Sequence, residues 1–402
     1  MYLLAFYSRF ILSKRRLTHH RAFHPMSNKA FEPAKLGPLT LTNHIVMAPM
    51  TRSRALGNEA NELMAEYYRQ RATAGLIISE GVSPSADGLG YARIPGLFNQ
   101  EQVTNWQRVT ETVHHHGGHI FIQLMHTGRV FHPLNLPEGA EGIAPSAIAA
   151  PGKMWTDEQQ MQDHPTPRAL TLEEIAQVRD EYVHSAKLAL EAGFDGVELH
   201  SANGYLLEQF LNPASNQRTD EYGGSVQNRA RFVLETTRAV VEAIGADRTG
   251  IRLSPWGVFN DMPIYPEVNE TYAYLAEELQ KIGIVYVHLV DHQSMGAPAL
   301  PAEIVPMIRE KFTNTLILSG GYTTLAQVDS ALASGHADLV AIGRPFISNP
   351  DLVERLKANQ PLAESDQATY YAPGPNGFAD GYTDYPMADG QPAGSFSPTY
   401  EA

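Results

Sequence analysis

The stretch VELHSANGYLLEQF ends a short apolar run with three polar residues at close spacing, His200, Asn203 and Tyr205. Imidazole and amide groups donate hydrogen bonds, and a phenol, which is protonated at pH 7, can also give up a proton. A single histidine at the end of a strand is more often structural than catalytic. Three such groups together raise the question of which element carries them and what faces them.

The chain alternates, past residue 43, between short apolar runs and segments of helical periodicity. Eight such segments have helical patterns: 62–74, 100–116, 171–192, 226–244, 270–282, 301–311, 323–334 and 350–358. The apolar runs predict eight strands: 44–50, 76–81, 119–125, 196–200, 250–254, 285–291, 315–321 and 339–344. Alternation of this kind predicts an α/β fold with a parallel sheet.

An open doubly wound sheet and a closed (β/α)8 TIM barrel both fit this alternation, but the number of strands and the chain length favour the barrel. No G-x-G-x-x-G motif follows a strand, because Arg93 occupies the third glycine position of GLGYARIPG. We expect a single barrel domain over residues 29–402, with a long loop after the third strand at about 126–170. Residues 1–28 would be an N-terminal extension.

The extension is basic, with six Lys or Arg and no Asp or Glu in residues 1–31. We interpret it as disordered or as an over-long start before Met26, a mitochondrial presequence or a weak membrane-surface segment being the alternatives. The net charge of −14 argues against nucleic acid and anionic membranes as partners. The chain has no cysteine, which excludes disulfides and thiolate metal sites and is compatible with a cytoplasmic location.

Chemistry in a TIM barrel takes place where strands end and the following loops begin. Polar or glycine residues occupy this position on most of the predicted strands. Each is weak evidence alone, but together they indicate one site on one rim. In strand order they are Met50, Thr51, Arg52, Glu80, Gly81, Gln123, His126, His200, Asn203, Arg252, Gly320, Gly321, Gly343 and Arg344.

Glycine-rich turns follow the seventh and eighth strands, at Gly320-Gly321 and at Gly343-Arg344. Loops at these two positions form the recurrent phosphate site of the fold, because their backbone N–H groups are exposed. The turns therefore predict a phosphate-bearing ligand, tight turns without a ligand being the alternative.

An inward-facing cation and two hydrogen-bonding groups are expected from Arg252, Gln123 and Thr51. A planar heterocycle that gains negative charge on reduction needs this kind of support. The structural alternative for Arg252 is an ion pair that closes the barrel mouth.

The chain resembles the Old Yellow Enzyme family of FMN-dependent ene-reductases, and in particular its bacterial branch of N-ethylmaleimide and nitrate-ester reductases. The resemblance covers about residues 31–387, and residues 200–231 are its most specific part. The matching stretches are LTNHIVMAPMTRSRA, LIISEGVSPSADG, FIQLMHTGR, VELHSANGYLLEQFLNPASNQRTDEYGGSVQNRARF, IRLSPWGVFNDM, GRPFISNPDLVERLK and GYTDYP.

The resemblance implies a non-covalent FMN, with NADPH or NADH as the reductant, and a ping-pong scheme in which reductant and alkene use one site in turn. It also assigns ten residues to the flavin. They are Pro49, Met50 and Thr51 beside the ring, Gly81, Gln123 and Arg252 around the pyrimidine and ribityl chain, and Gly320, Gly321, Gly343 and Arg344 at the phosphate.

Catalytic roles also follow from the resemblance. His200 and Asn203 resemble the pair that binds the oxygen of an α,β-unsaturated carbonyl or nitro compound, with nitrate esters as a further substrate class. Two neutral donors on one oxygen polarise the conjugated C=C. Tyr205 resembles the acid that protonates the α-carbon. Tyr371 resembles an aromatic pocket residue, and Met125 stands where many relatives have tryptophan, which changes the expected pocket.

Three other interpretations were weighed. The histidines of VHHHGGH (113–119) suggest a metal site, but histidines at a helix C-terminus are usually solvated, and we expect no metal. An aldolase or phosphosugar barrel would need a strand-end lysine, and none of the eight strands supplies one. A non-catalytic flavin-binding protein would not need the phenol. The enzyme is expected to be a monomer or a homodimer.

Overall fold

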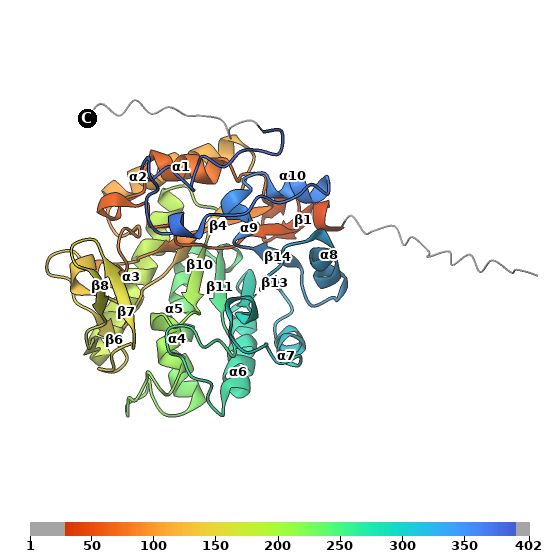
Figure 1. Cartoon of the computed structure of the whole chain (residues 1–402). Coiled ribbons are helices and arrows are strands. Elements are labelled where there is room, and N and C mark those ends of the chain that lie inside the picture. The colour runs from red at the N-terminus through yellow and green to blue at the C-terminus, as the bar shows by residue number, and fades with distance from the viewer. Residues whose placement is uncertain (1–28, 391–402) are drawn as a thin grey trace, which may run out of the picture.

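The computed structural model describes residues 29–390; the predicted extension over 1–28 and the last residues, 391–402, lie outside the described part. Eight parallel strands close into a barrel in the order β10-β11-β12-β13-β14-β3-β4-β5 (Figure 1). This confirms the (β/α)8 prediction over the open sheet. The strands are β3 (Ile45–Met47), β4 (Leu76–Val82), β5 (Ile120–Leu124), β10 (Gly196–Ser201), β11 (Thr249–Leu253), β12 (Tyr286–Val290), β13 (Thr315–Ser319) and β14 (Leu339–Ile342).

Helices surround the barrel, and neighbouring ones pack on each other, as α3 does on α5 and α5 on α6 (Figure 1). Nearly all strand residues are buried, which is why the strands appear in the sequence as continuous apolar runs. The helices are α1 (Glu62–Arg69), α2 (Gln100–His115), α3 (Leu172–Glu191), α4 (Leu206–Leu211), α5 (Val226–Ile244), α6 (Val268–Ile282), α7 (Ile304–Lys311), α8 (Leu325–Ala333), α9 (Pro345–Ser348) and α10 (Leu352–Lys357).

Four features differ from the sequence prediction or add to it. A hairpin of β1 (Ala34–Leu36) and β2 (Leu39–Leu41) precedes the barrel. Helix α4 lies in what was expected to be a loop, and an additional turn of helix, α9, precedes α10, which corresponds to the helix expected at 350–358. The long loop after β5 contains the short strands β6 (Ile143–Ala144), β7 (Lys153–Thr156), β8 (Gln160–Asp163) and β9 (Arg168–Ala169).

Two buried arginines hold the C-terminal segment against the barrel rim. Arg52 Nη2 donates to the carbonyl of Gly381 at 2.7 Å, and Arg54 Nη2 donates to the carbonyl of Thr369 at 2.8 Å. Both side chains are only 1% exposed, so their charges are satisfied mainly by backbone oxygens. The segment that carries Tyr371 is thereby fixed over the same end of the barrel as Thr51.

No helix within residues 29–390 has the length and apolar character needed to cross a bilayer.

Candidate active site

The mouth of the barrel brings polar residues of neighbouring strands side by side. His200 near the end of β10 is in register with Arg252 on β11, and Arg252 is in register with His288 on β12. Because adjacent residues of parallel strands point to the same side, the three side chains share one layer of the barrel interior. All three are buried. Of the strand-end residues predicted from the sequence, His200 and Arg252 are therefore neighbours in this layer.

His200 and Asn203 form a pair of neutral donors. The Nδ2 atom of Asn203 lies 3.4 Å from Nε2 of His200. Burial, followed by the positive charge of Arg252, lowers the pKa of His200 well below its ordinary value, so the imidazole is neutral at pH 7. Two N–H groups at this separation can both reach one oxygen atom placed between them.

Three neighbours hold Asn203, one at its side-chain amide and two at its backbone. His292 Nε2 lies 2.8 Å from Asn203 Oδ1, and Asn260 Nδ2 donates to the backbone carbonyl of Asn203 at 2.7 Å. Burial lowers the pKa of His292 to about 4, so at pH 7 its Nε2 must carry the proton to donate to Oδ1. The amide NH2 group is then left to point at His200. The backbone N–H of Asn203 donates to Ser254 Oγ at 3.0 Å.

Tyr205 faces the same space from the start of α4. Its ring centroid lies 5.1 Å from that of His200, and its hydroxyl lies 3.1 Å from the hydroxyl of Tyr91. Tyr205 is 8% exposed, and burial raises its pKa well above 10. The phenol is therefore protonated at pH 7. Burial also raises the pKa of Tyr91, so the two hydroxyls form a pair of protonated groups.

A buried network below this layer holds Gln123. Its Nε2 donates to Glu198 Oε1 at 2.8 Å, while Tyr286 Oη and His288 Nδ1 reach Glu198 Oε2 at 3.0 and 2.9 Å. Burial acts to raise the pKa of Glu198, but His288 and Arg252 outweigh it and hold the pKa below its usual value. The Glu198 carboxylate therefore fixes the side chain of Gln123, a residue that the resemblance assigns to the flavin.

Arg252 is a buried cation without an ion pair in the described part of the chain. It is 7% exposed, its Nε has no hydrogen-bond partner, and no carboxylate oxygen lies within ion-pair distance. This excludes the ion pair that was considered as its structural alternative. An unpartnered buried guanidinium is the donor that an anionic heterocycle needs, so this observation fits a reduced flavin.

Gly81 lies against Met125. A Cβ built on Gly81 would stand 2.5 Å from the Met125 sulfur, so a side chain at this position would require the methionine to shift. Met125 also packs in a cluster with Leu89, Ile94 and Tyr205. Met125 therefore borders Tyr205.

The residues expected at the flavin ring and phosphate lie at the ends of β3, β13 and β14. Pro49, Met50 and Thr51 are half-buried after β3, and Gly343 lies near Met50, whose sulfur would be 3.6 Å from a Cβ built there. Gly320, Gly321 and Arg344 are exposed, as a phosphate site at the rim requires. In the described residues, no side-chain hydrogen bond or ion pair of Arg344 is present. These positions remain predictions for phosphate binding.

Tyr371 lies at the outer edge of this mouth. Its side chain is 60% exposed, and its carbonyl accepts a hydrogen bond from Arg93 Nη2 at 2.9 Å. Among the histidines of 113–119, His114 Nε2 lies 3.0 Å from Asp195 Oδ2, and His116 Nδ1 lies 2.8 Å from the carbonyl oxygen of Thr112. Within residues 29–390, no group of three or more His, Asp or Glu side chains is placed to hold a metal ion.

Sequence reasoning missed several residues of the site. Glu198 and His288 could have been found, because each lies on a predicted strand, and Glu198 shares the inward face of His200 two residues away. His292 directly follows a predicted strand, which was also a signal. Tyr91 and Asn260 could not have been found from the sequence, because each lies in a loop whose path depends on the rest of the fold.

Fold and site together define a barrel oxidoreductase with a buried cation at its mouth. Residues 29–363 match the model of the NADH:flavin oxidoreductase / NADH oxidase family, and the chain belongs to this family. It is a flavin-dependent enzyme that uses a nicotinamide reductant. The resemblance to the Old Yellow Enzyme family is thereby confirmed.

Relatives of known name cover nearly the whole chain. 12-Oxophytodienoate reductase 7 of Oryza sativa subsp. japonica is 40% identical over 90% of this chain and 95% of its own length. Chanoclavine-I aldehyde reductase fgaOx3 of Penicillium roqueforti is 42% identical over 89% and 96%. Among solved structures, morphinone reductase has a TM-score of 0.85 at 40% identity, covering 91% of this chain and 98% of that chain. An Old Yellow Enzyme homologue from Zymomonas mobilis has a TM-score of 0.84 at 40% identity, covering 89% and 99%.

Proposed function

We propose that this protein is an FMN-dependent ene-reductase that uses NADH or NADPH to reduce the activated C=C bond of α,β-unsaturated carbonyl or nitro compounds, with nitrate esters as a further substrate class. The observation that carries the proposal is the pair of neutral donors, His200 and Asn203, 3.4 Å apart and beside the hydroxyl-bearing ring of Tyr205. Relatives named as morphinone reductase and 12-oxophytodienoate reductase support the same class of reaction.

The donor pair binds and polarises the substrate. The oxygen of the electron-withdrawing group accepts hydrogen bonds from His200 and Asn203, and the negative charge that develops on it in the transition state is stabilised by the same donors. Since both donors are neutral and already oriented, they hold this geometry without reorganisation when the charge appears. The double bond is thereby made electrophilic at its β-carbon.

Tyr205 supplies the proton. Its raised pKa keeps the hydroxyl protonated, so that it can donate to the α-carbon as negative charge develops there. Tyr91 then restores the proton to Tyr205 through the hydroxyl contact of 3.1 Å. Because Tyr91 is half-buried and Tyr205 is buried, this route leads outward to water.

FMN, when bound, would supply hydride chemistry to the site, with the nicotinamide cofactor as the source of the hydride. Three groups of residues would hold the flavin. The buried cation Arg252 would stabilise the negative charge of the reduced ring, and the amide of Gln123, fixed by Glu198, would bind the ring as well. Further contacts come from Pro49, Met50, Thr51 and Gly81 at the ring and from Gly320, Gly321, Gly343 and Arg344 at the phosphate, with Met125 and Tyr371 bordering the substrate.

A visible spectrum of the purified protein, titrated with a simple phenol, tests the proposal. A flavin band and a new long-wavelength charge-transfer band would place a phenolate between His200 and Asn203 over the ring. Turnover of an activated alkene with NADPH separates an enzyme from a flavin-storage protein. Failure to bind FMN, or a flavin band with neither phenol response nor turnover, would contradict the proposal.

A cytoplasmic location and a monomeric or homodimeric state belong to the same proposal. The absence of cysteine suits a reducing compartment. Gel filtration with light scattering determines the number of subunits.

A further inference from the structure

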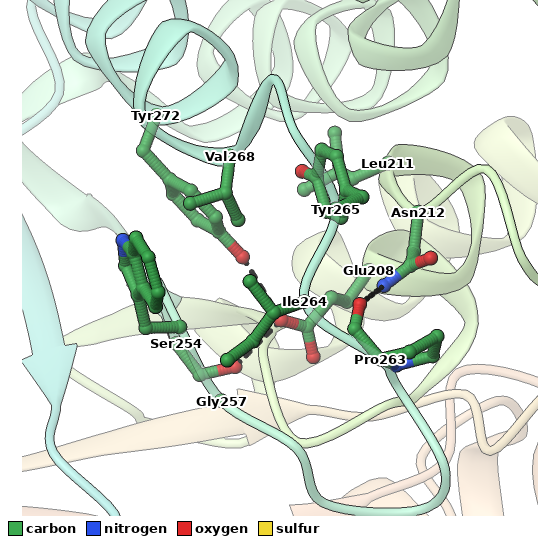
Figure 2. A pocket seen from close by; sticks show the side chains of 11 residues that line it. Glu208, Leu211, Asn212, Ser254, Gly257, Pro263, Ile264, Tyr265, Val268 and Tyr272 are labelled. Atoms are coloured by element: carbon green, nitrogen blue, oxygen red, sulfur yellow. Dashed lines mark hydrogen bonds between the residues drawn. The ribbon is translucent and has the colours of Figure 1, made fainter. Parts of the chain in front are cut away.

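A buried carboxylate, Glu208, lies behind the loop that carries Asn203 and Tyr205. It belongs to the first turn of α4 and is 4% exposed (Figure 2). Nothing in the proposed reaction uses it, and yet its two oxygens accept hydrogen bonds from three different segments. Its placement needs an explanation, because a buried carboxylate is unfavourable unless it is fully bonded.

The loop in front of Glu208 has an unusual backbone. Asn203 and Gly204 both have positive φ angles, of 60° and 75°. A Cβ on Gly204 would stand 2.7 Å from the carbonyl oxygen of Phe259, so only glycine fits there. Asn203 is held in the left-handed region, which a residue with a side chain adopts at some cost in free energy. Such a conformation persists only when the surroundings fix it.

Glu208 supplies that fixation through two routes. Its Oε2 accepts the Gly204 N–H at 2.6 Å. Its Oε1 accepts the Ser254 Oγ–H at 2.7 Å, and Ser254 Oγ in turn accepts the Asn203 N–H at 3.0 Å. The consecutive N–H groups of Asn203 and Gly204 therefore both lead to one carboxylate.

The third donor to Glu208 comes from outside the loop. Tyr272, on helix α6, donates its hydroxyl to Oε1 at 2.9 Å, so this oxygen accepts from both Tyr272 and Ser254 (Figure 2). The cavity beside these groups measures about 10 Å³, which is at the lower limit for one water molecule. Glu208 therefore has no room for a substrate of its own.

We propose that Glu208 is a positioning residue for the active site: through Gly204 and Ser254 it fixes the backbone of Asn203, and so the place of the Asn203 amide next to His200. This inference rests on the proposed function, because it assigns a role toward the same oxygen-binding pair. Only a carboxylate can accept from the Gly204 N–H and both hydroxyls at once.

Glu208→Gln is the informative variant because it keeps the volume of the side chain. Its NH2 group must face either the Gly204 N–H, where two donors meet, or the hydroxyls of Ser254 and Tyr272. In the second case Ser254 Oγ must accept hydrogen bonds from the Gln NH2 group and from the Asn203 N–H. The Ser254 hydroxyl hydrogen then has lost the carboxylate oxygen that accepted it. Either arrangement loosens the Asn203–Gly204 loop.

Tyr272→Phe is the matched control. It removes one hydrogen bond to the same carboxylate but leaves both routes to the loop intact. Ser254→Ala is a second test variant, smaller in volume, in case Glu208→Gln folds poorly.

The experiment measures the phenol dissociation constant of each holoenzyme at pH 8, from the charge-transfer band, together with flavin content and melting temperature. Burial raises the pKa of Glu208 to about 7, so the carboxylate form predominates at pH 8. Glu208→Gln is expected to weaken phenol binding about 10-fold and Ser254→Ala about 3- to 10-fold, since misplacement of a binding group by a fraction of an ångström has effects of this order. Tyr272→Phe is expected to change it less than about 2-fold.

Flavin content should stay at the wild-type level in all three variants. Equal phenol affinity in wild type and Glu208→Gln would overturn the inference, as would a loss in Tyr272→Phe as large as in Glu208→Gln. A wild type that gives no phenol response, or whose response survives His200→Ala unchanged, would instead contradict the proposed function, so the two failures are distinguishable.

Discussion

The hydroxyl of Tyr205 lies 3.1 Å from the hydroxyl of Tyr91, although the two residues belong to different loops of the barrel mouth. Their rings meet edge to face at a centroid distance of 6.1 Å. Neither hydroxyl has a charged partner, so both phenols remain protonated and each can serve as donor or acceptor to the other. A proton given up by the inner tyrosine can therefore be replaced by the outer one.

Tyr205→Phe should slow alkene reduction about 100-fold or more, the usual contribution of a positioned general acid. Flavin reduction by NADPH needs no proton from this residue and should change little. Stopped-flow measurement of the two half-reactions separates these effects. Equal losses in both half-reactions would contradict the assignment.

Tyr91→Phe tests the relay. It removes the hydroxyl that lies against Tyr205 but keeps the ring, so hydride transfer should be retained while proton transfer slows about 10-fold, less than the roughly 100-fold or more that the general acid itself contributes. The measurement is the solvent isotope effect on alkene reduction, which should rise in the variant. An unchanged rate and isotope effect would show that the proton reaches Tyr205 by another path.

His200→Ala should weaken phenol binding about 10- to 100-fold, because a hydrogen bond to a charged group contributes about 1.5–3 kcal/mol. The change is read from the charge-transfer band of the holoenzyme. His115→Ala, at an exposed position on α2, is the matched control and should bind phenol like the wild type. Unaltered affinity in His200→Ala would count against the oxygen-binding role.

Arg252→Gln should lower the reduction potential of the bound flavin, because the variant loses the buried cation that stabilises the anionic reduced form. A tenfold change in the relative affinity for the two redox states corresponds to about 30 mV for a two-electron couple. Redox titration with a reference dye measures the shift. Arg248→Gln removes an equal charge at an exposed position just before β11 and should leave the potential unchanged.

The fold could be predicted because strands of a buried parallel sheet consist of continuous apolar runs, which are visible in the sequence. Runs such as LIISEG and GVELH lie within one or two residues of β4 and β10. Helix α4 was not predicted because its six residues, LLEQFL, are all buried, and a short segment that is buried on every side has no amphipathic pattern. The helix expected at 350–358 is present as α10, but the turn of helix over Pro345–Ser348 was not predicted, because four residues are too few to show a helical period.

The site could be predicted only where strands position it. His200 and Arg252 are strand residues, and their register follows from the barrel itself. Tyr91 and His292 are contributed by loops, and their contacts with Tyr205 and Asn203 depend on how those loops cross the mouth. A hydrogen bond between residues 89 positions apart, such as that of His292 with Asn203, leaves no local pattern in the sequence.

The pH dependence of stability offers a test of the buried carboxyl of Glu80. Burial raises its pKa from 4.5 to about 7 against the opposing effect of Arg52. A group whose pKa is raised by folding contributes stability that is full below the unfolded pKa and is lost as pH rises through the folded one. The window for Glu80 is therefore pH 4.5 to 7. Buried histidines act in the opposite direction, since burial lowers the pKa of His126 to about 3.

The prediction for Glu80 therefore concerns a difference between two proteins. Relative to the wild type, Glu80→Gln should gain stability between pH 5 and pH 8, by at most about 3 kcal/mol, because one pKa unit corresponds to 1.36 kcal/mol. Urea unfolding of both proteins across this range gives the difference, in which the common effect of the histidines cancels. Glu111→Gln, at an exposed position on α2, should run parallel to the wild type. A constant offset between Glu80→Gln and the wild type from pH 5 to 8 would show that Glu80 is already ionised throughout, and that Arg52 outweighs burial.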